Sequence, residues 1–267
     1  MSILEKYKIP HCFDREYFNK VIEKAKRKKT INKLVEEIVI EGLNNTSDLE
    51  KITNEGGRIL YASNHKSHLD YIILGYVLAM NNLPIPRFAA GENLLCWPLN
   101  KIIDFRKMGA FSIDRQKNSN IEYLRELYKY IGNLIENKEN ILFFPEGGRS
   151  YNEGYKKPQT GLIRAVMNAV DKNNIKVYIE PINIKYDIVA EDEIFSSLKK
   201  VKFKSVFYYL LDSYALTKRY FGKEKGKIYI KFGFPSEIKE LGKDKKEIAD
   251  KIIDMIMKIG EKNARKI

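Results

Sequence analysis

The sequence predicts an α/β protein with a central, mostly parallel sheet flanked by helices and a helical N-terminal region. Apolar segments with strand-like and helix-like spacing alternate along the chain after residue 58, which is the pattern of parallel strands joined by helices. In addition, 44% of the 267 residues are hydrophobic, so the chain can build one substantial core.

The chain is expected to begin with helices. Residues 14–42 carry apolar side chains at helical spacing around a basic stretch at residues 24–29. Residues 44–57 are polar and rich in turn-forming residues, which is typical of a linker. We therefore divide the chain into a helical N-terminal region, residues 1–45, and a larger main domain, residues 46–267.

Strands and helices alternate through the main domain. Residues 58–63 form a mainly apolar run that predicts a buried strand, and apolar residues then recur at helical spacing over residues 69–80. The same reasoning predicts strands at residues 109–115, 140–145, 176–184 and 227–232, and helices at residues 120–136, 161–171 and 243–259.

An imidazole and a carboxylate follow the first of these strands. His65 and Asp70 lie five positions apart, where the strand leads into a helix, and open α/β sheets bind ligands at such places. An imidazole can take a proton from a hydroxyl while a carboxylate fixes its tautomer and stabilises the imidazolium. Alternatively, Asp70 only favours the first turn of a helix that begins near Ser67.

Two later segments offer groups that suit a phosphorylated substrate. The strand at residues 109–115 ends in Arg115, whose planar guanidinium can bind a phosphate through two hydrogen bonds. The strand at residues 140–145 leads into a turn that combines glycines with polar residues: Glu146, Gly147, Gly148, Arg149 and Ser150. Each segment also has a simpler explanation. Arg115 could be a solvated arginine on an edge strand, and a plain turn would explain the two glycines equally well, although not the polar residues beside them.

Four segments in order, residues 64–70, 109–115, 144–150 and 177–182, resemble the four sequence blocks of the glycerolipid acyltransferases. The resemblance spans about residues 58 to 184, roughly half of the chain. It implies acylation of glycerol-3-phosphate or of lysophosphatidate.

The details are more similar to the glycerol-3-phosphate and dihydroxyacetone-phosphate branch of that superfamily. This similarity lies in residues 65–71, 89–94, 146–150 and 158–161. Lysophosphatidate acyltransferases more often carry threonine where this chain has Gly148. The expected reaction is therefore transfer to the sn-1 hydroxyl of glycerol-3-phosphate, with lysophosphatidate or another lysophospholipid as the alternative acceptor.

The resemblance also implies a role for each site residue. His65 would be the general base, oriented by Asp70, while Arg115 and Arg149 would bind the acceptor phosphate. The remaining turn residues would shape the substrate pocket: Glu146, Gly147, Gly148 and Ser150. The acyl donor would be a thioester of coenzyme A or acyl carrier protein, which is already activated, so no metal ion or other cofactor is expected.

The other histidines and the cysteines carry less information. His68 is a rival for the base, because it too lies close to Asp70, whereas His11 precedes every motif. The sequence has no Cys-x-x-Cys or His-Glu-x-x-His pattern, so it gives no support for a zinc site. Cys12 and Cys96 are too far apart in the sequence to indicate a disulfide framework, which suits a reducing cytosol.

A net charge of +13 favours an acidic partner, either nucleic acid or an anionic membrane. Lysine and arginine are scattered and match no nucleic-acid-binding motif, so no specific nucleic acid is expected. Residues 194–220 mix aromatic and aliphatic residues with lysines, as in a segment that lies in a lipid interface, and residues 94–99 are a second candidate contact. A core helix with a solvated basic face would have the same composition as residues 194–220.

No apolar run approaches the roughly 20 residues that span a bilayer, and the first residues do not resemble a signal peptide. We therefore expect a cytoplasmic protein bound peripherally to the inner membrane surface. A non-enzymatic basic protein that binds membrane or nucleic acid on the same fold is the alternative from another class. The presence of both His65 and Asp70 disfavours it.

Overall fold

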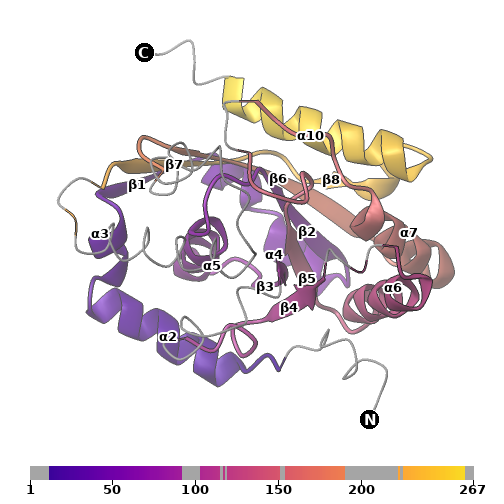
Figure 1. The fold of residues 1–267 in the computed structure, drawn as a ribbon, viewed down its shortest axis with the longest axis horizontal. Coiled ribbons are helices and arrows are strands. Elements are labelled where there is room, and N and C mark those ends of the chain that lie inside the picture. Colours follow the sequence, from indigo (N-terminus) through magenta and orange to yellow (C-terminus); the bar gives the residue numbers. More distant parts are fainter. Residues whose placement is uncertain are drawn as a thin grey trace.

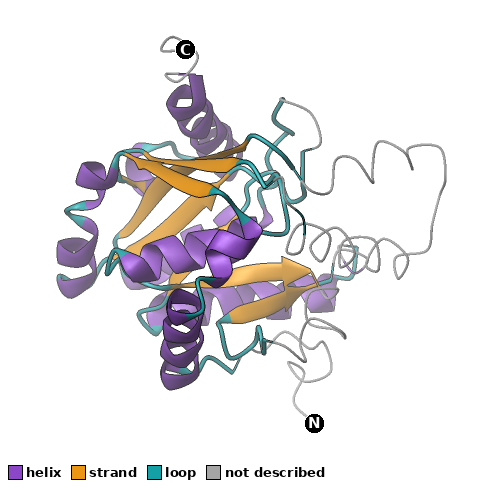
Figure 2. Cartoon of the chain, turned by 90° about the vertical axis from the view of Figure 1, so that its left-hand side faces the viewer, coloured by secondary structure: helices purple, strands orange, loops and turns teal. Residues whose placement is uncertain are grey.

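The structure is a computed structural model that describes residues 12–91, 103–114, 117, 119–150, 154–189, 222 and 225–261. Arg115, His11 and Cys96, together with the predicted membrane-contact segments at residues 94–99 and 194–220, lie outside the described residues. Within the described part, the strands form one eight-stranded sheet with helices on both of its faces (Figures 1 and 2).

The sheet is mostly parallel, as the sequence predicts. Its strand order is β1-β7-β6-β2-β5-β3-β4, with β8 paired to β6. The pairs that involve β6 with β7 and β6 with β8 are antiparallel, and the other pairs are parallel. The strands are β1 (Glu37–Glu41), β2 (Arg58–Ser63), β3 (Pro86–Gly91), β4 (Ala110–Ile113), β5 (Asn140–Phe143), β6 (Val177–Tyr186), β7 (Lys227–Phe232) and β8 (Ser236–Glu237).

The helices divide between the two faces and bury a separate apolar cluster on each. Figure 1 shows α6 beside α7, with α10 running along β6, whereas α5 covers the opposite face. The α-helices are α2 (Arg15–Arg27), α3 (Thr30–Leu34), α4 (Leu49–Asn54), α5 (Asp70–Met80), α6 (Ile121–Glu136), α7 (Gly161–Asn173) and α10 (Lys245–Glu261). Short 3-10 helices occupy Leu43–Thr46 and Ile238–Glu240.

Strand β2 lies at the centre and is buried along its whole length. Leu60 and Ala62 face the cluster under α6, α7 and α10, whereas Ile59 and Tyr61 face the cluster under α5. Because successive side chains of a strand point to opposite faces, this continuous apolar run packs against helices on both sides. The strand therefore holds the residues that follow it in a fixed position.

The structure corrects the expectation for the first part of the chain. Helices α2 and α3 form where helices are predicted, but Glu37–Glu41 forms strand β1 instead of a helix and pairs with β7 in the main sheet. Its three central residues are β-branched, which favours an extended backbone. The predicted linker contains α4, and the boundary between the two predicted regions at residue 45 stays a prediction.

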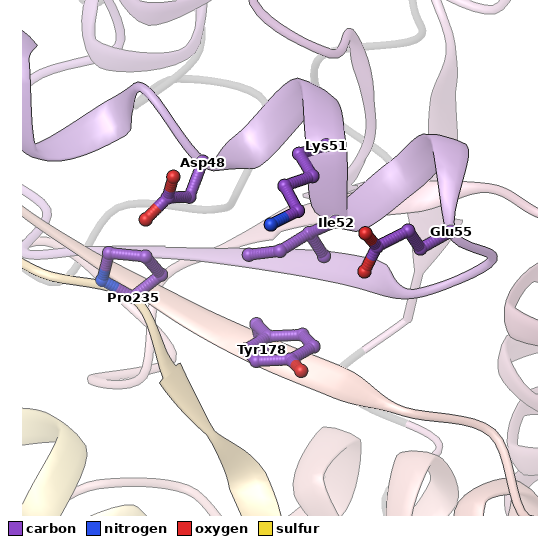
Figure 3. A pocket seen from close by; sticks show the side chains of 6 residues that line it. All are labelled: Asp48, Lys51, Ile52, Glu55, Tyr178 and Pro235. Atoms are coloured by element: carbon purple, nitrogen blue, oxygen red, sulfur yellow. The ribbon is translucent and has the colours of Figure 1, made fainter.

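A cavity of about 270 Å³ lies between α4 and the first half of β6 (Figure 3). It is lined by Asp48, Lys51, Ile52, Glu55, Tyr178 and Pro235. Tyr178 is near the beginning of β6, so this cavity lies away from the end of the strand where the predicted site residues gather. Among the helices of the described ranges, none has both the length and the apolar character needed to cross a bilayer.

Candidate active site

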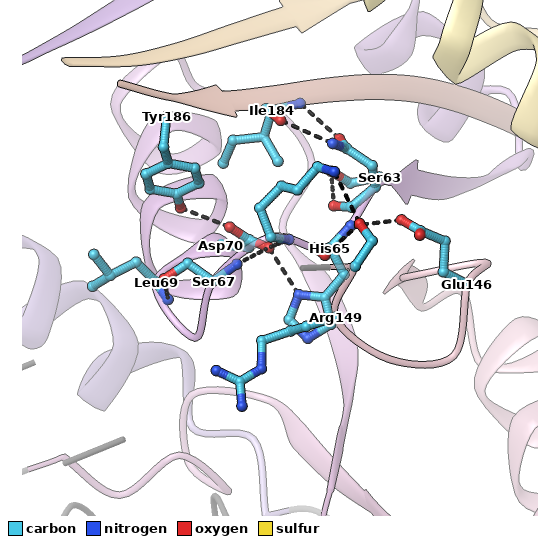
Figure 4. Close-up of polar contacts among 12 residues, drawn as sticks. Ser63, His65, Ser67, Leu69, Asp70, Glu146, Arg149, Ile184 and Tyr186 are labelled. Atoms are coloured by element: carbon cyan, nitrogen blue, oxygen red, sulfur yellow. Dashed lines mark hydrogen bonds and ion pairs between the residues drawn. The ribbon is translucent and has the colours of Figure 1, made fainter. Parts of the chain in front are cut away.

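The predicted site residues gather at one edge of the sheet. Strands β2, β5 and β6 are adjacent, and β2 is parallel to both of the others, so all three end at the same edge. His65 lies two residues after the last residue of β2, whereas Glu146 and Arg149 lie in the turn after β5. Figure 4 shows these three residues close together.

Asn64 connects the end of β2 to β6. Its side-chain amide donates to the carbonyl oxygen of Ile184 over 2.8 Å, and its side-chain oxygen accepts the Ile184 backbone N–H over 2.7 Å. Asn64 is almost fully buried, so both bonds are shielded from water. They fix the position of the next residue, His65, relative to the last residues of β6.

His65 and Asp70 form the pair that the sequence predicts. The Nδ1 atom of His65 lies 2.8 Å from Oδ2 of Asp70, which is the first residue of α5 and is fully buried. The same oxygen accepts the backbone N–H groups of Lys66 over 2.7 Å and Ser67 over 3.0 Å. These donors stabilise a negative charge on Asp70, so Nδ1 of His65 carries the proton and Nε2 is the basic atom.

The environment of His65 favours its neutral form. Burial lowers the pKa of its imidazole, and the charges of His68 and Arg149 act in the same direction, against the opposing hydrogen bond and charge of Asp70. The ring also stacks on Phe144, with 4.1 Å between the ring centroids and an angle of 16° between the planes. A neutral, fixed imidazole is the form that a general base requires.

The turn after β5 is bonded directly to the backbone of His65. Glu146 accepts the His65 backbone N–H with Oε1 over 3.1 Å and the Lys156 backbone N–H with Oε2 over 2.9 Å. The Ser150 backbone N–H donates to the His65 carbonyl over 2.9 Å, and Lys66 Nζ donates to the Ser150 hydroxyl over 2.9 Å. Two segments that are about 80 residues apart in sequence are thus held as one unit.

Gly147 is required in this turn for steric reasons. Gly147 has a φ of +66°, which L side chains rarely adopt, and a Cβ atom there would lie 2.6 Å from Cγ of Gln159. Its N–H donates to the Phe144 carbonyl over 2.9 Å and closes the turn. Gly148 and Arg149 follow and are only partly buried, so this part of the turn is accessible from outside.

The structure brings His65, Asp70 and the whole turn from Glu146 to Ser150 together, while Arg115 lies outside the described residues. Arg149 lies beside the His65 imidazole (Figure 4), close enough for its charge to affect the pKa of that ring. Sequence reasoning missed Tyr186, whose hydroxyl donates to Oδ1 of Asp70 over 2.6 Å. Within the described ranges, no group of three or more His, Cys, Asp or Glu side chains is arranged to hold a metal ion.

The chain matches a family model described as acyltransferase over residues 23–185. It is 33% identical over 207 residues to a glycerol-3-phosphate acyltransferase of Colwellia psychrerythraea, an alignment that covers 74% of this chain and 24% of that protein. It is 34% identical over 166 residues to a glycerol-3-phosphate acyltransferase of Histophilus somni, covering 62% of this chain and 20% of that protein. The chain therefore spans about a quarter or less of the length of these relatives.

The fold is similar to that of a solved structure, the 1-acyl-sn-glycerophosphate acyltransferase of Thermotoga maritima. The TM-score is 0.50, with 15% sequence identity over 92% of this chain and 80% of the other. At this identity the likeness concerns the fold, and it agrees with a mostly parallel sheet between helices.

Proposed function

Because this chain belongs to the acyltransferase family, we propose that it transfers a fatty acyl group from a thioester to the sn-1 hydroxyl of glycerol-3-phosphate. The observation that carries the proposal is the buried pair of His65 and Asp70, in which Nδ1 faces the carboxylate and Nε2 is the basic atom. The donor is a thioester of coenzyme A or acyl carrier protein.

The reaction follows from this geometry in one displacement. Nε2 of His65 takes the proton of the acceptor hydroxyl while the hydroxyl oxygen attacks the thioester carbonyl. The carbon–sulfur bond breaks, and the leaving thiolate takes this proton from the imidazolium, which restores the neutral His65. Asp70 holds the imidazole in the required tautomer and stabilises its positive charge during the transfer.

Arg149 supports a phosphorylated acceptor. It lies in the turn beside His65, and a guanidinium can hold a phosphate through two parallel hydrogen bonds. Arg115, which follows β4 by two positions in the sequence, is proposed as a second phosphate ligand.

In this proposal Glu146 shapes the pocket by holding the turn, because both of its oxygens already accept backbone N–H groups. Gly147, Gly148 and Ser150 form the wall of the pocket beside Arg149.

The names of the two relatives support glycerol-3-phosphate as the acceptor, whereas the structural neighbour is named for a lysophosphatidate acceptor. Gly148 agrees with the first choice, because lysophosphatidate enzymes more often carry threonine there. Acylation of lysophosphatidate or another lysophospholipid is therefore the second candidate reaction.

We also propose that the protein works in the cytoplasm, bound peripherally to an anionic membrane surface. Two features support this proposal: the net charge of +13 and the mixture of lysines with aromatic and aliphatic residues at positions 194–220. Sedimentation with anionic vesicles, compared with neutral vesicles, tests it. Equal recovery of the protein in the supernatant of both would contradict it.

The reaction is tested by transfer of radiolabelled palmitoyl from coenzyme A or acyl carrier protein, with glycerol-3-phosphate and lysophosphatidate offered in parallel. We expect the wild-type protein to produce lysophosphatidate and His65→Ala to lose activity by roughly 10²- to 10⁴-fold. His68→Ala is the matched control and should lose far less, because Asp70 contacts His65. If only lysophosphatidate is acylated, the acceptor is lysophosphatidate and not glycerol-3-phosphate. If no donor supports transfer to either acceptor, the proposed enzymatic function is wrong.

A further inference from the structure

We infer that Tyr186 is a positioning residue of the catalytic pair, because its hydroxyl holds the oxygen of Asp70 that does not face His65. The inference rests on the proposed function, in which His65 is the base. Tyr186 acts through the carboxylate and does not itself contact the substrate.

The contact is short, buried and formed between distant parts of the chain. The Tyr186 hydroxyl donates to Oδ1 of Asp70 over 2.6 Å, and the two residues are 116 positions apart. Tyr186 is 8% exposed and Asp70 is fully buried, so water does not compete freely for this bond. Figure 4 shows the phenol approaching the carboxylate from the side opposite to His65.

The two oxygens of Asp70 have different donors. Oδ2 accepts the His65 imidazole and the backbone N–H groups of Lys66 and Ser67, whereas Oδ1 accepts the Tyr186 hydroxyl. A buried carboxylate needs donors on both oxygens, since an unpartnered charged oxygen is costly away from water. Without the Tyr186 hydroxyl, the carboxylate of Asp70 would be freer to rotate, and Oδ2 would no longer be held toward the His65 imidazole.

The position of Tyr186 is fixed by the same strand that anchors the base. Asn64 bonds both backbone groups of Ile184, two residues before Tyr186 on β6, and Asn64 directly precedes His65. Any shift of β6 relative to β2 would therefore move the phenol and the imidazole with respect to Asp70. This arrangement makes the Tyr186 hydroxyl a specific part of the site and not a chance neighbour.

The phenol also moderates the charge that Asp70 presents to His65. An O–H dipole directed at Oδ1 draws negative charge away from the oxygen that faces the imidazole. Removing the dipole leaves a stronger negative field at His65 and stabilises the imidazolium. The pKa of His65 should then rise, and the acid limb of kcat/KM should move to higher pH.

The test compares Tyr186→Phe with Tyr61→Phe. Tyr61 is also buried, but its hydroxyl donates to the Pro84 carbonyl over 2.9 Å, so its removal costs a buried bond without touching Asp70. We expect Tyr186→Phe to lower kcat about tenfold or more, because without this hydrogen bond the charged carboxylate no longer holds the imidazole in place, with little change in KM for glycerol-3-phosphate. Its acid limb should move to higher pH, while that of Tyr61→Phe should not.

A fluorinated tyrosine at position 186 keeps the experiment decisive if Tyr186→Phe does not fold. Fluorination preserves the ring and strengthens the hydroxyl as a donor, so the acid limb should move to lower pH, opposite to the effect of phenylalanine. An unchanged acid limb in the fluorinated protein would overturn the inference, as would a phenylalanine variant that behaves like Tyr61→Phe. Full activity of His65→Ala would instead overturn the proposed function itself.

Discussion

The carboxylate of Glu146 accepts the backbone N–H of His65 with one oxygen and the backbone N–H of Lys156 with the other. Glu146 is buried, and together with Ser150 it joins the turn after β5 to the segment that carries the base. The position of His65 therefore depends on a bond to its backbone as well as on the Asp70 bond to its ring.

Glu146→Gln should lower both stability and activity. A glutamine has a single acceptor oxygen for two backbone N–H groups, so one N–H would face an amide nitrogen and lose its partner. We expect a loss of about 1–3 kcal/mol in the free energy of unfolding and a lower kcat. Denaturant unfolding and the acyl-transfer assay measure the two effects.

Glu247→Gln is the matched control for this substitution. Glu247 also accepts a backbone N–H, that of Lys243, but it lies on the surface of α10. Its replacement should change stability only slightly and leave kcat unchanged. Similar effects of the two substitutions would show that the bond to His65 has no special importance.

Arg149→Gln should weaken acceptor binding and change the pH dependence. Loss of the guanidinium should raise KM for glycerol-3-phosphate about tenfold or more, because a charge-assisted contact to phosphate disappears. Burial is the main reason that the pKa of His65 is low, and the charge of Arg149 adds to it, so the acid limb of kcat/KM should move to higher pH.

The exposed Arg164 on α7 provides the control for net charge. Arg164→Gln removes the same charge away from the site and should leave both KM and the acid limb unchanged. An Arg149→Gln protein with the wild-type KM would contradict the role of Arg149 in phosphate binding.

Much of the fold could be predicted because its signals are local. The strand at residues 58–63 has the bounds that the sequence predicts, and His65 and Asp70 are near neighbours on the segment that follows it. Strand β1 was predicted wrongly, because the spacing of its short apolar run fits a helix as well as a strand. Pairing with β7, about 190 residues later, decides its conformation.

Tyr186 could not be identified from the sequence for a related reason. Strand β6 was expected to end at Ile184, whereas it continues for two more residues and ends with Tyr186. Nothing in the spacing of this residue indicates that it reaches Asp70, because the contact depends on the order of β2 and β6 in the sheet. A side-chain contact between distant parts of the chain, such as this one, is identified only when the order of the strands in the sheet is known.

The buried carboxyl of Glu180 should make the free energy of unfolding decrease as the pH rises. Its carboxyl is fully buried on β6, and neither oxygen has a hydrogen-bond partner among the described residues. Burial raises the pKa of Glu180 to about 9, against a weaker opposite effect of the nearby Gly233 N–H, which itself donates to the Pro181 carbonyl. The folded state therefore favours the protonated acid, and its contribution is complete below the unfolded-state pKa of 4.5 and is lost as the pH rises toward about 9.

Glu180→Gln should remove this pH dependence. Glutamine has a similar shape and stays neutral, so the variant should be more stable than the wild type at pH 7 by a few kcal/mol, since each pH unit above 4.5 contributes about 1.4 kcal/mol. Denaturant unfolding at several pH values between 5 and 9 measures the difference. Parallel stability curves for the two proteins would contradict the assignment of a neutral Glu180.

The last prediction concerns two glycines with opposite surroundings. Gly147 has a φ of +66°, which L side chains rarely adopt, and a Cβ atom there would lie 2.6 Å from Cγ of the exposed Gln159 side chain, which would have to shift. Gly147→Ala should therefore destabilise the protein by about 1–3 kcal/mol and lower kcat, because the strained turn carries Arg149 and Glu146. Gly75 lies within α5, where a Cβ atom would meet no side chain of the described residues within 4 Å, so Gly75→Ala should stabilise the helix by roughly 0.5–1 kcal/mol.

Thermal unfolding and the transfer assay measure the Tm and the kcat of both alanine variants. The comparison shows whether a loss of activity comes from this turn or from any alanine placed at a glycine. Gly75→Ala should raise the Tm and keep the wild-type kcat, although α5 begins with Asp70. Gly147→Ala should lower both quantities, since its backbone N–H must still reach the Phe144 carbonyl to close the turn. A Gly147→Ala protein with unchanged kcat would show that the shape of this turn does not set the position of the catalytic pair.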